Sequence, residues 1–479
     1  MRRAWVTTVL VGSAVLLSAI AAGQGGAPAT ISVDEIRPGM RGHGLTVFRG
    51  TEPERFDVEV IDVLRAFRPG QDLILIRTPH PVLDRAGTVA GMSGSPIYLD
   101  GRLAGAYAYG WLFGRDPVAG VTPIANMLAE LGRPVRRDAF PGAELLPRTA
   151  RASGAGAAEA PRVHRAGLPP WDGSGRVRAL DALRRHAERR GRPREGLVPV
   201  ATPLWLAGFD ERVAALLGEE LSGFGLVALQ GGGSGARSGR RGTARYVDGG
   251  AIGVQLIRGD VAATAVGTVT HVAGRRLIAF GHPMLDAGEL GLPTCTARVL
   301  HVLVSEARSF KIAEAAEPLG ALVHDRQATI VVDTSIDGVT IPVRLRVLGV
   351  AGAPRTEWNV EVASHRLLSP VLLLAATLNA LAATASDDAH AVLVARQRVH
   401  VSGRPPLELV DHVAAEHGPT DLRALSGLRL FEVVEAAYGN PFEEARVERV
   451  EVDLEVSFRR DWKRIVDVSV AEPQVDPGA

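Results

Sequence analysis

Residues 87–98, GTVAGMSGSPIY, place three glycines, two serines and a proline between two apolar segments. Glycine packs no side chain and loses the most backbone freedom on folding, so this run needs a local reason. It is either a hairpin bend or a loop whose backbone must turn sharply and present its amides. An acyl-transfer site fits the second interpretation. Ser93 is then the candidate nucleophile, and the amides of Gly91 and Ser93 are the candidate donors to the oxyanion.

The sequence on both sides of this loop is typical of β-strands. Residues 56–64, FDVEVIDVL, alternate apolar and polar side chains, and residues 73–78, LILIRT, form a short apolar run. After the loop, residues 98–110, YLDGRLAGAYAYG, give a strand, an Asp-Gly turn and a second strand of small residues. A trypsin-like barrel has this order after its nucleophile loop.

The serine loop with these flanks resembles the nucleophile segment of the SpoIVB-type serine peptidases, a family of chymotrypsin-like enzymes. A second block, residues 252–284, resembles the family's histidine segment, in which a Gly-Thr-x-Thr strand and a short hairpin precede a Gly-His pair. The resemblance implies that His282 is the general base. In the family the histidine segment comes first, whereas here Ser93 precedes His282. The implied fold is therefore mainly β, with two chymotrypsin-like β-barrels in permuted order, inserted helices and a C-terminal β-rich module.

The acidic member of a triad has no direct counterpart at the position that the resemblance indicates. In the family it lies just before the serine loop, where this chain has residues 77–87, RTPHPVLDRAG. Asp84 is the nearest carboxylate and is our candidate for this role. Asp286 and Asp325, both near the histidine block, are alternatives, and a Ser-His dyad without an acid is another.

Thirteen histidines are present, and most of them have no pattern that indicates a site. His43 lies in a Gly-x-Gly turn and is a competitor for the role of base, although a structural hydrogen bond is the simpler interpretation. The chain has no His-Glu-x-x-His motif, and its single cysteine, Cys295, excludes a multi-cysteine metal site and an intramolecular disulfide. The glycines of residues 230–242 lack the strand-turn-helix context of a dinucleotide site. We expect no metal and no other cofactor.

Net charge bears on the partners of the protein, and the N-terminal residues bear on its location. Its 54 basic and 53 acidic residues nearly cancel, so nothing favours a nucleic-acid partner. Arg2 and Arg3 precede an apolar stretch and several small residues, which predicts a signal peptide over residues 1–23. No cysteine follows to carry a lipid anchor. We expect a periplasmic or extracellular protein with no stable membrane span after signal removal.

Composition divides the mature chain into four parts. In order, these are a Ser-bearing β-barrel, a low-complexity linker with an arginine-rich helix, a His-bearing β-barrel with an inserted helix, and a C-terminal β-rich module with one buried helix: residues 28–146, 147–198, 199–327 and 328–479. The inserted helix is expected over residues 205–221. The buried helix is expected within residues 367–385, with Ser369 as its N-cap and Pro370 at its first position.

These features together predict an exported serine endopeptidase that acts on a protein or peptide substrate. The Arg/Gly/Ala-rich stretches 148–170 and 229–249 make the chain itself one candidate substrate. The alternative is a catalytically degenerate peptidase fold that serves as a scaffold or binding protein of the cell envelope. The departure from the family pattern at Asp84 favours this alternative, and the intact serine loop opposes it.

Overall fold

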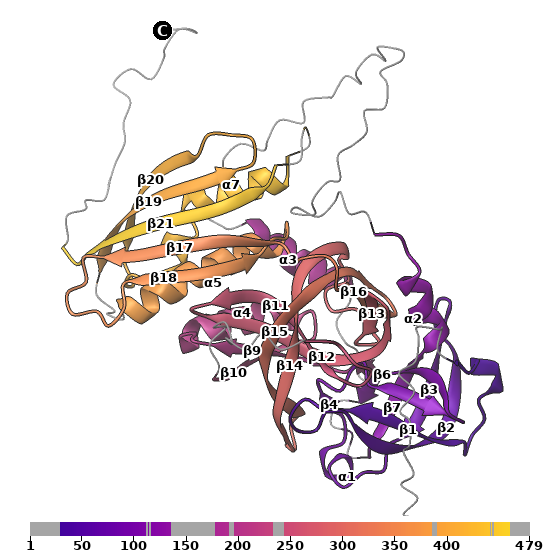
Figure 1. Cartoon of the computed structure of the whole chain (residues 1–479). Helices are drawn as coiled ribbons and strands as arrows, with labels where there is room; N and C mark the ends of the chain where they lie inside the picture. Colours follow the sequence, from indigo (N-terminus) through magenta and orange to yellow (C-terminus); the bar gives the residue numbers. More distant parts are fainter. Residues whose placement is uncertain are drawn as a thin grey trace, which may run out of the picture.

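The computed structural model describes a mainly β protein, as predicted, with two barrels followed by a C-terminal sheet unit (Figure 1). The described residues are 29–111, 114, 116–135, 178–190, 196–232, 244–385, 390–440, 442 and 445–459. The expected signal peptide lies outside them, as do the expected linker 148–170 and part of 229–249.

The first barrel is a closed antiparallel sheet of six strands. In spatial order these are β1 (Arg41–Thr46), β2 (Glu54–Arg68), β3 (Gln71–Arg77), β7 (Val118–Pro123), β6 (Arg102–Trp111) and β5 (Pro96–Leu99). Strand β5 pairs with both β6 and β1, which closes the barrel. The alternation seen in the sequence of β2 places Phe56, Val58 and Val60 in the barrel core.

The second barrel is also closed and antiparallel. Its strands in spatial order are β11 (Ala251–Gly259), β12 (Ala262–Ala273), β13 (Arg276–Ala279), β16 (Thr329–Asp333), β15 (Ser309–Arg326) and β14 (Gly288–Leu303). Strand β11 pairs with both β12 and β14. The last strand, β16, lies beyond residue 327, where we had expected this barrel to end. Two six-stranded barrels, with the serine-bearing one first, agree with the fold that the resemblance implied.

The two barrels pack on one another through buried apolar side chains. Leu103 and Ala106 of β6, with Met127 of α2 (Ile124–Leu131), join Ile278 of β13 and Val331 of β16 in one cluster. Burial of such side chains is the main force that holds the barrels together. This interface is the part of the fold that positions the candidate site.

The insertion that precedes the second barrel differs from the prediction of one helix over residues 205–221. Strand β9 (Thr202–Ala207) comes first and pairs with β12 and with β10 (Leu226–Gln230). Helix α4 (Glu211–Ser222) begins only after Asp210, whose carboxylate accepts a hydrogen bond from the Arg212 amide. Trp205 and its neighbours are buried in a strand with partners on both edges, and this tertiary pairing overrides the helical pattern. The arginine-rich helix is present as α3 (Arg178–Arg190).

The C-terminal unit extends the sheet of the second barrel. From β11 the strand order continues through β18 (Glu357–Ala363), β17 (Thr340–Leu348), β21 (Val447–Ser457), β19 (Ala391–Val401) and β20 (Leu407–Ala415). Two short helical segments, α6 (Leu422–Leu425) and α7 (Arg429–Tyr438), precede β21.

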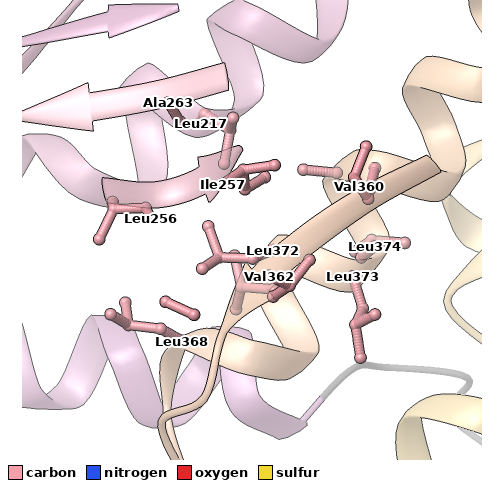
Figure 2. Close-up of a cluster of buried hydrophobic side chains, with 14 of the residues drawn as sticks. Leu217, Leu256, Ile257, Ala263, Val360, Val362, Leu368, Leu372, Leu373 and Leu374 are labelled. Carbon is pink, nitrogen blue, oxygen red and sulfur yellow. The ribbon is translucent and has the colours of Figure 1, made fainter. Parts of the chain in front are cut away.

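Helix α5 (Leu368–Thr384) is buried almost along its whole length, as predicted. Figure 2 shows its Leu372 among side chains of β18 and β11, including Val362 and Ile257, so α5 joins the C-terminal unit to the second barrel. Ser369 is not the N-cap. Its hydroxyl donates to the carbonyl oxygen of Ala363, and the helix begins at Leu368, two residues before the start that an N-cap at Ser369 would give. No helix in the described ranges is long and apolar enough to cross a bilayer.

Candidate active site

The serine loop joins the short strand β4 (Val89–Ala90) to β5. Gly91 and Gly94 have φ values of +90° and +99°, in the region that favours glycine. A Cβ at Gly94 would also collide with the carbonyl oxygen of Thr268 in the second barrel. The hydroxyl of Ser95 donates to the carbonyl oxygen of Met92 (2.7 Å), so the second serine stabilises the loop turn.

Two threonines of the second barrel hold this loop. Thr268 donates its amide to the carbonyl oxygen of Ser93 (2.9 Å) and its hydroxyl to that of Gly91 (2.9 Å). The hydroxyl of Thr270 donates to the carbonyl oxygen of Gly94 (2.7 Å). These residues form the Gly-Thr-x-Thr motif that the sequence linked to the histidine. Its threonines therefore clamp the serine loop of the other barrel.

His282 follows β13 and is buried at the same interface. Gly281, just before it, packs on the methyl groups of Ala106 and Ala108, and Thr122 donates its hydroxyl to the carbonyl oxygen of Gly281 (2.6 Å). These three partners belong to the first barrel. The backbone of Phe280, two residues before His282, lies against Gly94. The permuted fold thus brings the serine and histidine segments into direct contact.

The side chains of the two candidate catalytic residues are not hydrogen-bonded to each other. Ser93 is fully buried, and its hydroxyl has no hydrogen-bond partner among the residues that the structure describes. Nδ1 of His282 lies 2.9 Å from the carbonyl oxygen of Pro283. A direct contact of about 2.6–3.2 Å, which general-base catalysis needs, is therefore absent from this conformation.

The candidate acids occupy different environments. Asp325, at the end of β15, is fully buried and accepts hydrogen bonds from the amides of Met284 (2.8 Å) and Leu285 (2.6 Å). These amides lie directly after the His-Pro pair. Asp84 is exposed on α1 (Leu83–Ala86), and its carboxylate accepts a long hydrogen bond from the amide of His80 (3.4 Å). Asp286 is exposed as well.

His43, the competing base, lies on β1 and stacks on the ring of Tyr98 at 5.0 Å. Its backbone lies opposite Asp57 of β2 and Tyr98 of β5. This position agrees with a structural histidine.

Lys311 is a residue that the sequence analysis missed. It is fully buried on β15, and its Nζ donates to the hydroxyls of Thr46 (2.7 Å) and Thr268 (3.1 Å). Its Cβ and Cδ line the space in front of Gly91. Burial lowers the pKa of the Lys311 ammonium to about 7, and the described residues give it no ion pair. The sequence contained one signal for Lys311. Only two of the 54 basic residues are lysines, and lysine, unlike arginine, can release its proton in a protein.

A cavity of about 680 Å³ lies beside the loop. Gly87, Thr88 and Ala90 line it from the residues before the loop, and Gly110 and Trp111 line it from the end of β6. Residues 198–201 and 304–309 form further walls. A partly open cavity next to the serine loop is suited to hold a substrate side chain.

Residues 27–128 match the family model described as SpoIVB peptidase S55, a family of serine peptidases. The resemblance inferred from the serine loop is thereby confirmed for the first barrel. The matched segment contains Gly91, Ser93 and Asp84, whereas His282 and Asp325 lie outside it. Comparisons with curated proteins and with solved structures gave no match.

Proposed function

We propose that this chain, whose first barrel carries the SpoIVB peptidase S55 segment, is an exported serine endopeptidase acting on protein or peptide substrates. Ser93 is the nucleophile, His282 the general base and Asp325 the residue that orients the histidine segment. The observation that carries the proposal is the clamp of Thr268 and Thr270 on the serine loop, at the same barrel interface as His282. Export rests on the sequence of residues 1–23.

The chemistry assigned to these groups is acyl transfer. Ser93 Oγ attacks the scissile carbonyl carbon while its proton passes to a ring nitrogen of His282. The amides of Gly91 and Ser93 donate to the oxyanion of the tetrahedral intermediate. His282 then gives the proton to the leaving amine, and water hydrolyses the acyl-enzyme by the same route. Because Ser93 and His282 are not hydrogen-bonded here, the active form requires a rearrangement at the interface.

Asp325 replaces Asp84 in this proposal because of its contacts. Asp325 is fully buried and accepts hydrogen bonds from two backbone amides. The amides that bind Asp325 belong to the turn that follows His282, so the carboxylate fixes the direction of that turn. Asp84 makes its hydrogen bond within its own turn of chain.

A fluorophosphonate probe, which reacts with activated serines, tests the proposal together with hydrolysis of an unfolded protein. Wild-type protein should be labelled and should cleave the substrate, and Ser93→Ala should do neither. Ser32→Ala, at an exposed serine that caps a short surface turn, is the matched control and should behave as wild type. Equal labelling of wild type and Ser93→Ala would show that the reactive serine is elsewhere.

The second candidate function is a non-catalytic scaffold built on a peptidase fold. The complete burial of Ser93 favours it, since a nucleophile must meet its substrate. Folded wild-type protein that is neither labelled nor active, under conditions that open the interface, would support the scaffold.

A further inference from the structure

One edge of β6 is shared by three different parts of the chain. Strand β5 pairs with the first half of this edge, from Arg102 to Ala106. The serine loop takes the next position, where Gly94 and Ser95 exchange backbone hydrogen bonds with Tyr107. Beyond Tyr107 the serine loop no longer pairs with this edge of β6, because the loop turns toward the second barrel.

Residues 197–201, here called the cleft segment, fill that open edge. The amide of Val200 donates to the carbonyl oxygen of Ala108 (2.8 Å), and β8 (Leu197–Pro199) pairs antiparallel with residues 109–111. The next carbonyl oxygen, that of Ala201, accepts a hydrogen bond from the amide of Gly91 (3.3 Å). Gly91 is one of the two donors assigned to the oxyanion.

The cleft segment also crosses from one barrel to the other. Immediately after Ala201 the chain enters β9, which pairs with β12 of the second barrel. An extended strand therefore runs past the serine loop, with its carbonyl directed at the loop amide. A polypeptide substrate of a serine peptidase needs this same arrangement, because its scissile carbonyl must reach the oxyanion donors.

We propose that the cleft segment occupies the substrate site as an internal stand-in for substrate. This inference rests on the proposed function, because it assigns a substrate class and a mode of control to the same site. In this conformation Ser93 is fully covered, and a substrate strand must displace the cleft segment from β6 before it can bind.

The side chains of the cleft segment define the substrate class. Val198 and Val200 are buried and lie on one face of the strand, whereas Leu197 and Pro199 are half-buried. Strand addition to a sheet edge takes its affinity from main-chain hydrogen bonds and its specificity from the pockets for alternate side chains. The site is therefore suited to an extended polypeptide with β-branched or small apolar residues at alternate positions.

Displacement of the cleft segment is feasible because its attachment is short. Strand β8 has three residues, and elements with few contacts open at low free energy. A segment tethered in the same chain nevertheless competes at an effective concentration on the order of millimolar. Substrates in solution should therefore bind weakly until the segment leaves.

The first test locks the segment with a reversible disulfide. Leu197 and Trp111 lie directly opposite each other in the antiparallel pair, and the one native cysteine, Cys295, is buried elsewhere. The double variant Leu197→Cys/Trp111→Cys should lose fluorophosphonate labelling and peptide hydrolysis by at least about tenfold on oxidation, and regain both on reduction. Oxidation of the control pair Arg344→Cys/Asn359→Cys, opposite each other in β17 and β18, should change neither.

The second test measures binding directly. A fluorescent peptide with the sequence of residues 196–203, GLVPVATP, should bind the variant Val200→Glu, whose buried carboxylate expels the segment, and bind wild type at least about tenfold more weakly. Val410→Glu, at an exposed position, is the control and should match wild type. Reduced Leu197→Cys/Trp111→Cys should bind the peptide better than the oxidised form.

The two tests separate this proposal from the function proposed above. If no form is labelled, the peptidase assignment fails, and peptide binding by the reduced and oxidised forms still decides the role of the segment. If labelling and peptide binding are the same in both forms, the segment is a structural strand and the inference is overturned. The disulfide pair decides the matter even if Val200→Glu does not fold.

Discussion

Thr268 donates its backbone amide to the carbonyl oxygen of Ser93 at 2.9 Å, although the two residues belong to different barrels. The Thr268 hydroxyl also accepts from Lys311 and donates to Gly91, so one threonine connects the buried amine to the serine loop. Loop geometry therefore depends on the packing of the second barrel. A substitution in that barrel should alter the chemistry of Ser93 without touching the first barrel.

Thr268→Val should test this dependence. The change removes a hydroxyl but keeps the shape, and it leaves the Gly91 carbonyl and one donor of Lys311 without their partner. Such losses in a buried site destabilise proteins by about 1–3 kcal/mol. We expect a lower urea midpoint and slower labelling of Ser93. Thr268→Ser, which keeps the hydroxyl, should recover most of both.

The two serines of the loop should differ greatly in importance. Ser93→Ala should reduce kcat by up to about 10⁶-fold, the scale of nucleophile loss in serine peptidases. Ser95→Ala removes only the hydrogen bond to Met92 and should cost about 1 kcal/mol of stability, with most activity retained. Equal loss of kcat at both positions would contradict the choice of nucleophile.

The carboxylates can be compared with one pair of matched variants. Asp325→Asn should reduce kcat/KM by about tenfold or more, the scale of one lost hydrogen bond to a charged group, because the new amide keeps only one acceptor oxygen for Met284 and Leu285. Asp84→Asn, at an exposed position, should leave kcat/KM near the wild-type value. Activity measured against a small peptide at several pH values checks both. A larger loss of kcat/KM in Asp84→Asn than in Asp325→Asn would show that Asp84 has the acidic role.

The histidines allow the same comparison. His282→Ala should abolish turnover if His282 takes the proton of Ser93. His43→Ala removes a ring that stacks on Tyr98 and should leave most of the turnover. Single-turnover acylation is the direct measurement. A larger effect at His43 would show that the histidine block has a structural role.

Lys311 should make stability depend on pH. Its folded-state pKa is about 7, below its usual value of 10.5, so between these values the unfolded chain binds more protons than the folded one. The free energy of unfolding should therefore rise from pH 7 toward pH 10.5, and below pH 7 the buried charge should cost the most. Urea denaturation at pH 6, 7, 8 and 9 measures the slope. Lys311→Met should remove this part of the slope, and a variant with an unchanged slope would contradict the assignment.

The sequence by itself determined the features that depend on local chain geometry. The serine loop follows from glycines at positive φ and from the Asp-Gly turn that follows it, and the strand over residues 56–64 follows from its alternation. The buried helix α5 follows from a long apolar run in which the few polar side chains are small. Each of these signals lies within a few residues of the structure that it predicts.

Only the tertiary structure decided which distant segments meet. The clamp of Thr268 on Ser93, the turn held by Asp325 and the burial of Lys311 all join strands of different sequence regions, and no local pattern encodes such pairings. The same is true of residues 205–207, which belong to the predicted helix 205–221 but lie in strand β9, where they pair with β12. Residues 197–201 have the composition of an ordinary short strand. Their place beside the serine loop follows from the one open edge that the barrel leaves there, because unpaired backbone groups must find partners wherever the fold offers them.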